Sequence, residues 1–329
     1  MSFRHIFGHE RQIKQLKRAV TARRIPHAYL FHGIRGVGKW TIARQYAKHL
    51  YCRQRADDAC DSCASCRKID HESHADVDFV APEKGVIKLD QIRMIQNHAR
   101  VSPLEGEKRL FIIDDADCLN EEAANALLKI LEEPSAATMF VLVSARQYQL
   151  PQTVLSRCQK VAFAPLKRET IESYLRETGD YDRGNAFLLA AQCGGSIGTA
   201  LSMNETAFLE NKNALIGTLV AADCAHNLAD LMKITEIFGS TKETIMDRLA
   251  VLHGWYRDVL VYGESGRTDD IINQDILETV ASMAECLPRY RAIKALNHVE
   301  RAMDAIEKNV NKQLTLETMV FKLSHLVEK

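Results

Sequence analysis

The stretch "HAYLFHGIRGVGKWT", residues 27–41, decides the fold. It begins as a short apolar run typical of a buried β-strand, which ends at Gly33 and gives way to a glycine-rich loop. In a strand–loop–helix unit of this kind, backbone N–H groups and a helix N-terminus surround a phosphate. Gly33, Gly36 and Gly38 allow the tight path, and Lys39 can reach the outer phosphates. The stretch therefore predicts a phosphate-binding loop, with ATP or ADP as the candidate ligand.

The residue after Lys39 departs from the usual loop pattern. That pattern, G-x-x-x-x-G-K-[ST], ends in a hydroxyl that ligates Mg²⁺, whereas this chain has Trp40. Thr41 lies about 100° further round the predicted helix, so it cannot simply take over that position, although it stays a candidate nucleotide contact. Two interpretations remain open: a structural loop that binds nucleotide weakly or not at all, and an ATPase with an altered metal site.

A second part of the site is predicted at "LFIIDDAD", residues 110–117. P-loop enzymes hold Mg²⁺ with an acidic residue at the end of a buried strand, and Asp114 stands at that position here. The alternative is that Asp114 and Asp115 only solvate the mouth of a loop.

The first half of the chain alternates strand and helix patterns. Because such alternation is typical of a parallel sheet covered on both faces, we predict an α/β domain over residues 1–165. After Pro165 the patterns are helical, and we predict a small helical domain over 166–206 and an all-α domain over 207–329. The strands are expected at residues 27–33, 77–80, 109–114, 138–144 and 159–163, and helices at 89–99 and 121–133.

Four of the nine cysteines are close together in the sequence. Cys52, Cys60, Cys63 and Cys66 have the spacing C-x₇-C-x₂-C-x₂-C. The C-x₂-C steps let neighbouring thiolates converge, and a tetrahedral Zn²⁺ ion satisfies four of them without an open position. We therefore predict a structural zinc module at residues 52–66 with no catalytic role. The alternative is four reduced cysteines without a metal.

The composition excludes several classes of protein. Lysine plus arginine equals aspartate plus glutamate, at 43 each, so a basic field over the whole chain is absent and any DNA contact is expected to be local or shared with partners. No apolar run approaches the roughly 20 residues of a membrane span, and the polar start does not resemble a signal peptide. We expect a cytoplasmic chain that does not contact a membrane.

Three motifs together resemble one family. "RIPHAYLFHGIRGVGK", "ANALLKILEEP" and "LPQTVLSRCQ" are similar to the AAA+ clamp-loader subunits of the bacterial replicase, and "NVNKQLTLETMVFKL" resembles their last collar helix. The resemblance runs from about Phe7 to the C-terminus. It implies an AAA+ P-loop domain with an inserted zinc module, a lid domain over 166–206 and a collar domain over 207–329.

The chain departs from this family at three positions of the nucleotide site. A hydroxyl residue is replaced by Trp40, and the glutamate that orients the attacking water is replaced by Asp115, a degenerate site whose carboxylate would stand about an ångström too far away. The family's sensor-2 arginine falls on Gly198, and sensor 1 falls near Ser144. Three changes in one site indicate that hydrolysis is not the task of this chain, which favours a stator over the gamma/tau motor subunits.

The resemblance assigns a different catalytic part to Arg157. In the family, the arginine of "SRC" is a finger that completes the ATP site of a neighbouring subunit, although Arg157 could instead be a surface residue that caps a local helix. The implied partners are the delta and gamma/tau subunits and, through the assembled complex, the sliding clamp and primed DNA. Two other functions stay open: an active motor that uses Lys39, Asp114 and Thr41, and a zinc-dependent DNA-binding module that acts alone.

Overall fold

The computed structural model describes residues 2–54, 57–179, 181, 183–203, 212–217, 235–268, 270–308 and 310–327. These residues form two compact units. The first unit contains Met1–Asp180 and Cys193–Leu201, and the second contains Tyr181–Gln192 and Ser202–Lys329. The division into three domains stays a prediction, and its boundary at residues 206–207 lies outside the described residues.

The first unit is built on a five-stranded parallel sheet. The strand order is β2-β3-β4-β1-β5, and every neighbouring pair runs parallel. Each strand falls on one of the five apolar runs, so the prediction of an α/β domain is confirmed. The strands are β1 (Ala28–Gly33), β2 (Val77–Val80), β3 (Arg109–Ile113), β4 (Thr138–Ser144) and β5 (Gln159–Phe163).

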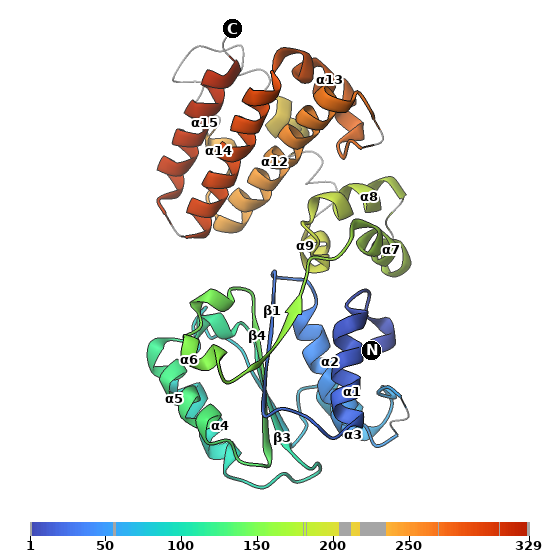
Figure 1. Cartoon of the computed structure of the whole chain (residues 1–329), viewed down its shortest axis with the longest axis vertical. Helices are drawn as coiled ribbons and strands as arrows, with labels where there is room; N and C mark the ends of the chain where they lie inside the picture. The colour runs from blue at the N-terminus through green and yellow to red at the C-terminus, as the bar shows by residue number, and fades with distance from the viewer. Residues whose placement is uncertain are drawn as a thin grey trace. The chain divides into compact units, whose positions relative to one another are not determined.

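Helices cover both faces of this sheet, as predicted (Figure 1). Alternate residues of one strand point to opposite faces, so Tyr29 and Phe31 pack into one core and Leu30 into the other. The first core includes α1 (Glu10–Thr21), α2 (Lys39–Tyr51) and α3 (Ala64–Asp70). The second includes α4 (Leu89–Ala99), α5 (Glu121–Glu132) and α6 (Gln152–Leu155).

Helix α5 shows how local sequence sets an element. The side chain of Asn120 accepts a hydrogen bond from the Ala123 N–H at 2.8 Å and so caps the N-terminus of the helix. Glu121 and Glu122 suit the positive end of the helix dipole. The helix ends at Glu132, shortly before Pro134, a residue that cannot continue it.

The parallel order gives the sheet two chemically different edges. Strand β1 ends at Gly33, β3 ends beside Asp114 and β4 ends at Ser144, so the sequence-predicted nucleotide residues share the carboxyl edge. Arg157 precedes β5 by two positions, and Gln159 pairs with Tyr29 near the start of β1. Arg157 therefore lies at the amino edge.

The remaining helices complete both units. In the first unit, α7 (Arg168–Thr178) and α9 (Ile197–Ser202) follow the sheet. The described residues of the second unit form helices and connecting loops without a strand, and Trp255 is fully buried in its core. Its elements are α8 (Arg183–Gln192), α12 (Lys242–Ser265), α13 (Leu277–Cys286), α14 (Arg289–Glu307) and α15 (Lys312–Val327). No helix of the described ranges is long and apolar enough to cross a membrane.

Candidate functional site

The phosphate loop follows β1 with the backbone shape that its glycines predict. Gly33, Gly36 and Gly38 all have positive φ, and Gly38 is the residue before the first turn of α2. A Cβ atom at Gly33 would lie 2.1 Å from the carbonyl oxygen of Phe163 on β5, so only glycine fits there. The loop therefore has the form of a phosphate cradle at a helix N-terminus.

The ammonium group of Lys39 contacts the loop itself. Lys39 is the first residue of α2 and is only 6% exposed, and its Nζ donates hydrogen bonds to the carbonyl oxygens of Gly33 at 2.8 Å and Ile34 at 2.7 Å. Burial lowers the pKa of Lys39, and the carboxylates of Asp115 and Asp114 oppose that shift. In this arrangement the positive charge is held by backbone carbonyls.

The two residues after Lys39 take different environments. The ring of Trp40 packs edge-on against Phe79 of β2, with 5.5 Å between the ring centroids. Trp40 also packs against the core beneath α1 and α2, whereas Thr41 is exposed. The position that holds a metal-binding hydroxyl in the usual pattern is thus part of the hydrophobic packing here.

Asp114 and Asp115, which follow β3, interact with the charge of Lys39 but differ in their environments. Burial, and then the charge of Asp115, raise the pKa of Asp114, while Lys39 partly offsets that shift. Asp115 has a φ of 40°, a left-handed conformation that is costly for a residue with a side chain, and its N–H donates to Asp114 Oδ1 at 3.0 Å. The pair provides two carboxyl groups, the ligand type that a magnesium site needs.

A third carboxylate, Asp117, was missed by the sequence analysis. Its side chain is 2% exposed and accepts hydrogen bonds from the Ser144 hydroxyl at 2.8 Å and from Arg146 Nε at 2.9 Å. Burial alone would raise the pKa of Asp117, but these hydrogen bonds lower it overall. The hydroxyl expected at sensor 1 is therefore bound to a carboxylate of its own chain. The sequence gives one signal for the ion pair of Asp117 and Arg146: these residues have opposite charges and follow β3 and β4, respectively.

Position 198 contacts the phosphate loop directly through its backbone. The Gly198 N–H donates to the carbonyl oxygen of Gly36 at 2.9 Å. A Cβ atom added at Gly198 would lie 2.8 Å from Gly36 Cα, and one added at Gly36 would lie 2.4 Å from Ser196 Oγ. Because the three atoms nearest to an added Cβ at Gly198 are all backbone atoms of Gly36, any side chain there, arginine included, would force the two segments apart.

Arg157 is held at the amino edge by three acceptors. Its Nη2 donates to Glu132 Oε1 at 2.7 Å, and its Nη1 donates to the carbonyl oxygen of Thr153 at 2.9 Å and to Ser156 Oγ at 3.3 Å. The side chain is 34% exposed. The structure thus separates Arg157 from the other nucleotide residues, since the five residues of β5 span about 13 Å between the two edges.

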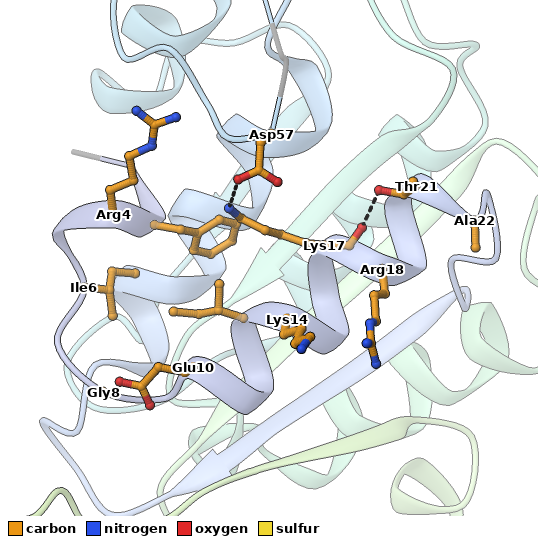
Figure 2. Close-up of a pocket in the computed structure, with 12 residues that line it drawn as sticks. Arg4, Ile6, Gly8, Glu10, Lys14, Lys17, Arg18, Thr21, Ala22 and Asp57 are labelled. Atoms are coloured by element: carbon orange, nitrogen blue, oxygen red, sulfur yellow. Dashed lines mark hydrogen bonds and ion pairs between the residues drawn. The ribbon is translucent and has the colours of Figure 1, made fainter.

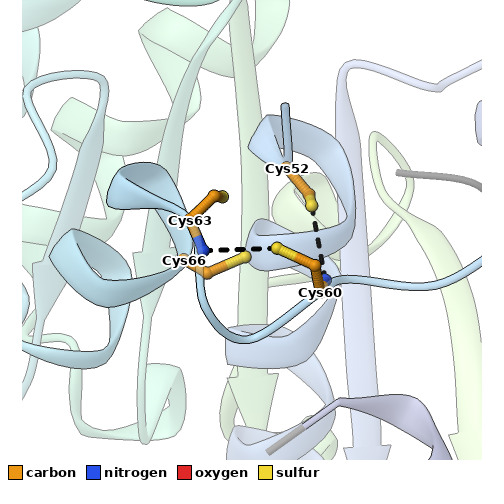
Figure 3. Close-up of side chains that lie close together, drawn as sticks. All are labelled: Cys52, Cys60, Cys63 and Cys66. Carbon is orange, nitrogen blue, oxygen red and sulfur yellow. Dashed lines mark hydrogen bonds between the residues drawn. The ribbon is translucent and has the colours of Figure 1, made fainter. Parts of the chain in front are cut away.

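The four clustered cysteines come together at the end of α2 (Figure 3). Cys52 follows α2, Cys63 precedes α3 and Cys66 lies in its first turn. Their sulfur atoms lie within 4.8 Å of one another, so the cluster could bind a metal. The Cys60 N–H donates to Cys52 Sγ and the Cys63 N–H donates to Cys60 Sγ, each at 3.3 Å. Such donors suit sulfur atoms that carry negative charge.

The pKa values of the cluster differ between its ligand atoms. Hydrogen bonds from Ser62 and from the backbone of Cys63 lower the pKa of Cys60 to about 6, whereas burial raises the pKa of Cys66. A buried thiol resists ionisation unless a cation stands beside it, and a divalent metal supplies that charge. The donor set therefore fits a closed, four-sulfur metal site.

A buried lysine ties this module to the body of the first unit. The side chain of Lys48 on α2 is inaccessible to solvent and forms ion pairs with Asp61, inside the module, and with Asp70 at 2.8 Å. Burial opposes its charge, but these two carboxylates raise the pKa of Lys48 overall. The pairs fix the cysteine loop and the end of α3 against α2.

A cavity of about 730 Å³ lies elsewhere, between the N-terminal segment and α1 (Figure 2). Apolar side chains such as Ile6 line it together with the basic residues Arg4, Lys14 and Arg18, and Lys17 pairs with Asp57 at 3.2 Å. None of the predicted nucleotide or metal residues lines this cavity. It is separate from the phosphate loop.

Comparisons with known proteins match nearly the whole chain. The family described as "DNA polymerase III, delta subunit" matches residues 8–167, and "DNA polymerase III, delta subunit, C terminal" matches residues 206–325. DNA polymerase III subunit delta' of Bacillus subtilis is 32% identical over 319 residues, which cover 95% of each chain.

Tau subunits are also similar but much longer. Subunit tau of Bacillus subtilis is 28% identical over 92% of this chain, and subunit tau of Escherichia coli is 32% identical over 66% of it. The match spans 58% and 36% of those two tau chains, respectively.

Proposed function

Because the chain belongs to the delta', tau and gamma family of DNA polymerase III clamp-loader subunits, we propose that it is the delta'-type stator of a clamp loader. It assembles with delta and gamma/tau subunits into a complex that opens the sliding clamp and places it on primed DNA. The match over 95% of both chains to delta' supports this choice over tau. The role places the chain in the cytoplasm, with the replicating DNA.

The proposal includes little or no ATP hydrolysis by this chain. The observation that carries it is the backbone contact between Gly198 and Gly36, because the lid position that needs an arginine has no room for any side chain. Trp40 packs against Phe79 and offers no oxygen to Mg²⁺. The phosphate loop keeps the shape of a cradle through Gly33, Gly36, Gly38 and Lys39. A nucleotide bound there would stabilise the fold and would not be hydrolysed.

Arg157 acts on a neighbouring subunit in this proposal. The amino edge is about 13 Å from the carboxyl edge, so Arg157 does not reach the phosphate loop of its own chain. It is partly exposed, as a side chain that contacts a second subunit must be. An arginine supplied in trans lowers the barrier of phosphoryl transfer by stabilising the transition-state charge.

The cysteine module holds structural Zn²⁺ in this proposal. Four sulfur ligands suit tetrahedral Zn²⁺, and the sulfur atoms of Cys52, Cys60, Cys63 and Cys66 lie within 4.8 Å of one another. Bound zinc would cross-link the end of α2 and the start of α3. A closed site has no position for substrate, so the module contributes folding energy and no catalysis.

The helices of the second unit form the collar in this proposal. Four large apolar side chains of α14 and α15 are exposed, and in this proposal another subunit covers them. They are Tyr290, Ile293, Leu314 and Phe321. Residues 1–165, 166–206 and 207–329 are proposed as the AAA+, lid and collar domains.

One observation favours a second function, an active motor subunit. Lys39, Asp114 and Asp115 are the residue types that a nucleotide–metal site needs, and the two aspartates lie close enough to Lys39 to favour its charged form. Under this alternative, Thr41 or a water molecule would replace the missing hydroxyl as a metal ligand.

Nucleotide binding by the isolated chain separates the two functions. The purified protein is titrated with labelled ATP and ADP, with and without Mg²⁺, and hydrolysis is followed in the same samples. The stator proposal expects no turnover above buffer, whether or not nucleotide binds. Turnover that Lys39→Ala abolishes would reject the proposal and establish the motor.

A further inference from the structure

The end of helix α5 breaks a local rule of helix electrostatics. Glu132 is its last residue and Glu133 follows directly, so two carboxylates stand at the negative end of the helix dipole. Cations are favoured at that end, and acidic residues there are unfavourable. A sequence that breaks a local rule does so most often at a functional site.

Glu132 has a specific partner, and Glu133 has none in the described part of the chain. Glu132 Oε1 accepts from Arg157 Nη2 at 2.7 Å, across from the end of α5 to the residues after α6. Both side chains are partly exposed, at 43% for Glu132 and 34% for Arg157. An exposed pair of this kind contributes little to folding stability, so the fold does not explain it.

The hydrogen bonds of Arg157 leave part of its guanidinium available. The group carries five N–H donors. Two on Nη1 go to Thr153 O and Ser156 Oγ, and one on Nη2 goes to Glu132. Among the described residues, the Nε–H and the second Nη2–H have no acceptor. The side chain is thus fixed by three bonds and still has two donors for an external anion.

We propose that Glu132 is a positioning residue for Arg157: its carboxylate fixes the guanidinium so that the two remaining N–H groups face the phosphate oxygens of a nucleotide on the adjoining subunit. This inference rests on the proposed function of Arg157. Displacement of a catalytic group by an ångström costs about 10²-fold in rate, so a long side chain gains from an anchor at its far end. Glu132 does not itself contact the nucleotide.

The test uses the reconstituted complex with gamma/tau, delta, clamp and primed DNA, and measures kcat and KM for ATP. Glu132→Ala is expected to lower kcat at the adjoining site by about 10-fold with KM unchanged, because an unanchored arginine is in place for less of the time. Glu132→Gln is expected to lose less, since its amide oxygen still accepts. Glu133→Ala is the matched control at the same helix end and is expected to equal wild type.

A double variant distinguishes positioning from a structural role. In the Arg157→Ala background, Glu132→Ala is expected to add no further loss, because the two act through one group. Additive losses, a kcat of Glu132→Ala equal to that of Glu133→Ala, or a higher kcat would each overturn the inference. If Arg157→Ala itself leaves the rate unchanged, the proposed role of Arg157 is rejected, and the role of Glu132 is rejected with it. Co-elution of every variant with the complex confirms that assembly is intact.

Discussion

The two edges of the central sheet use their polar groups in opposite ways. At the carboxyl edge, Lys39 is bound to loop carbonyls, Ser144 to Asp117 and the Gly198 N–H to Gly36, so the groups expected to handle nucleotide are bound within the chain. At the amino edge, Arg157 is partly exposed and keeps two N–H donors without an acceptor among the described residues.

This difference has a physical reason, because the phosphate loop and Arg157 contribute differently to folding. The phosphate loop is also the connection between β1 and α2, which packs on the sheet, so its shape can be kept for folding without its chemistry. Arg157 instead forms three hydrogen bonds within its own chain and keeps two N–H donors without an acceptor among the described residues. The difference agrees with the proposal that Arg157 acts on a neighbouring subunit.

The largest expected effect tests the amino edge. Arg157→Ala is expected to lower ATP turnover at the adjoining site of the reconstituted complex by about 10³-fold, since the transition-state charge loses its arginine. Phosphate release in the presence of clamp and primed DNA measures it. Arg93→Ala is the control, because Arg93 is 63% exposed and pairs with Asp90 on its own helix. Equal rates for the two variants would place the chemistry elsewhere.

The proposed zinc module has a structural role and is expected to contribute nothing to the chemistry of either sheet edge. We expect about one zinc per chain, and removal of the metal by chelation to lower the free energy of unfolding by about 4 kcal/mol if free zinc exceeds the dissociation constant by about 10³. Denaturant unfolding and metal analysis measure this.

Two serine variants sharpen that result. Cys66→Ser is expected to lose the metal and the same stability, and Cys286→Ser, at an exposed cysteine outside the module, is expected to keep both. ATP turnover per assembled complex is expected to stay unchanged for Cys66→Ser. A module without metal would contradict the structural role.

The contact between the lid position and the loop is tested by restoring the arginine. Gly198→Arg is expected to destabilise the chain by about 1–3 kcal/mol, because its Cβ meets the backbone of Gly36 at 2.8 Å. It is expected to create no ATPase. Gly217→Ala serves as the control, since an added Cβ meets nothing within 4 Å there. A stable variant that hydrolyses ATP would show that the carboxyl edge needs only its arginine.

The smallest expected effect concerns Asp114. Its pKa lies above the usual 3.8 because of burial and the neighbouring Asp115, so its ionised form disfavours folding at every pH above the folded-state pKa. Asp114→Asn is expected to stabilise the chain by about 1 kcal/mol at pH 7. The gain should shrink as pH falls through the folded-state pKa and vanish below 3.8. Unfolding curves at several pH values measure it, and a destabilised variant at pH 7 would contradict the assignment.

Much of this could be predicted because it is written in local patterns. The five strands follow apolar runs, Asn120 caps α5 at a short polar signal, and the cysteine spacing brings four sulfur atoms together. Each of these depends on residues that are near one another in the sequence. The assignments of Thr41 and of Arg157 as nucleotide and finger residues stay predictions.

The remainder depended on contacts that no local pattern contains. Gly36 and Gly198 are far apart in the sequence, and Asp117 meets Arg146 only because β3 and β4 are neighbours in the sheet. The partner of Arg157 was equally hidden, since the two glutamates at the end of α5 do not show which group Glu132 contacts. Strand order and side-chain direction decided these pairs.

Comparing two variants tests directly whether Arg157 or Lys39 of this chain takes part in ATP hydrolysis. Lys39→Ala and Arg157→Ala of this chain are placed separately in the same reconstituted complex, and ATP turnover with clamp and primed DNA is measured side by side. If this chain is a stator, Lys39→Ala is expected to keep wild-type turnover and Arg157→Ala to lose about 10³-fold at one site. A loss with Lys39→Ala and none with Arg157→Ala would contradict it and make this chain a motor.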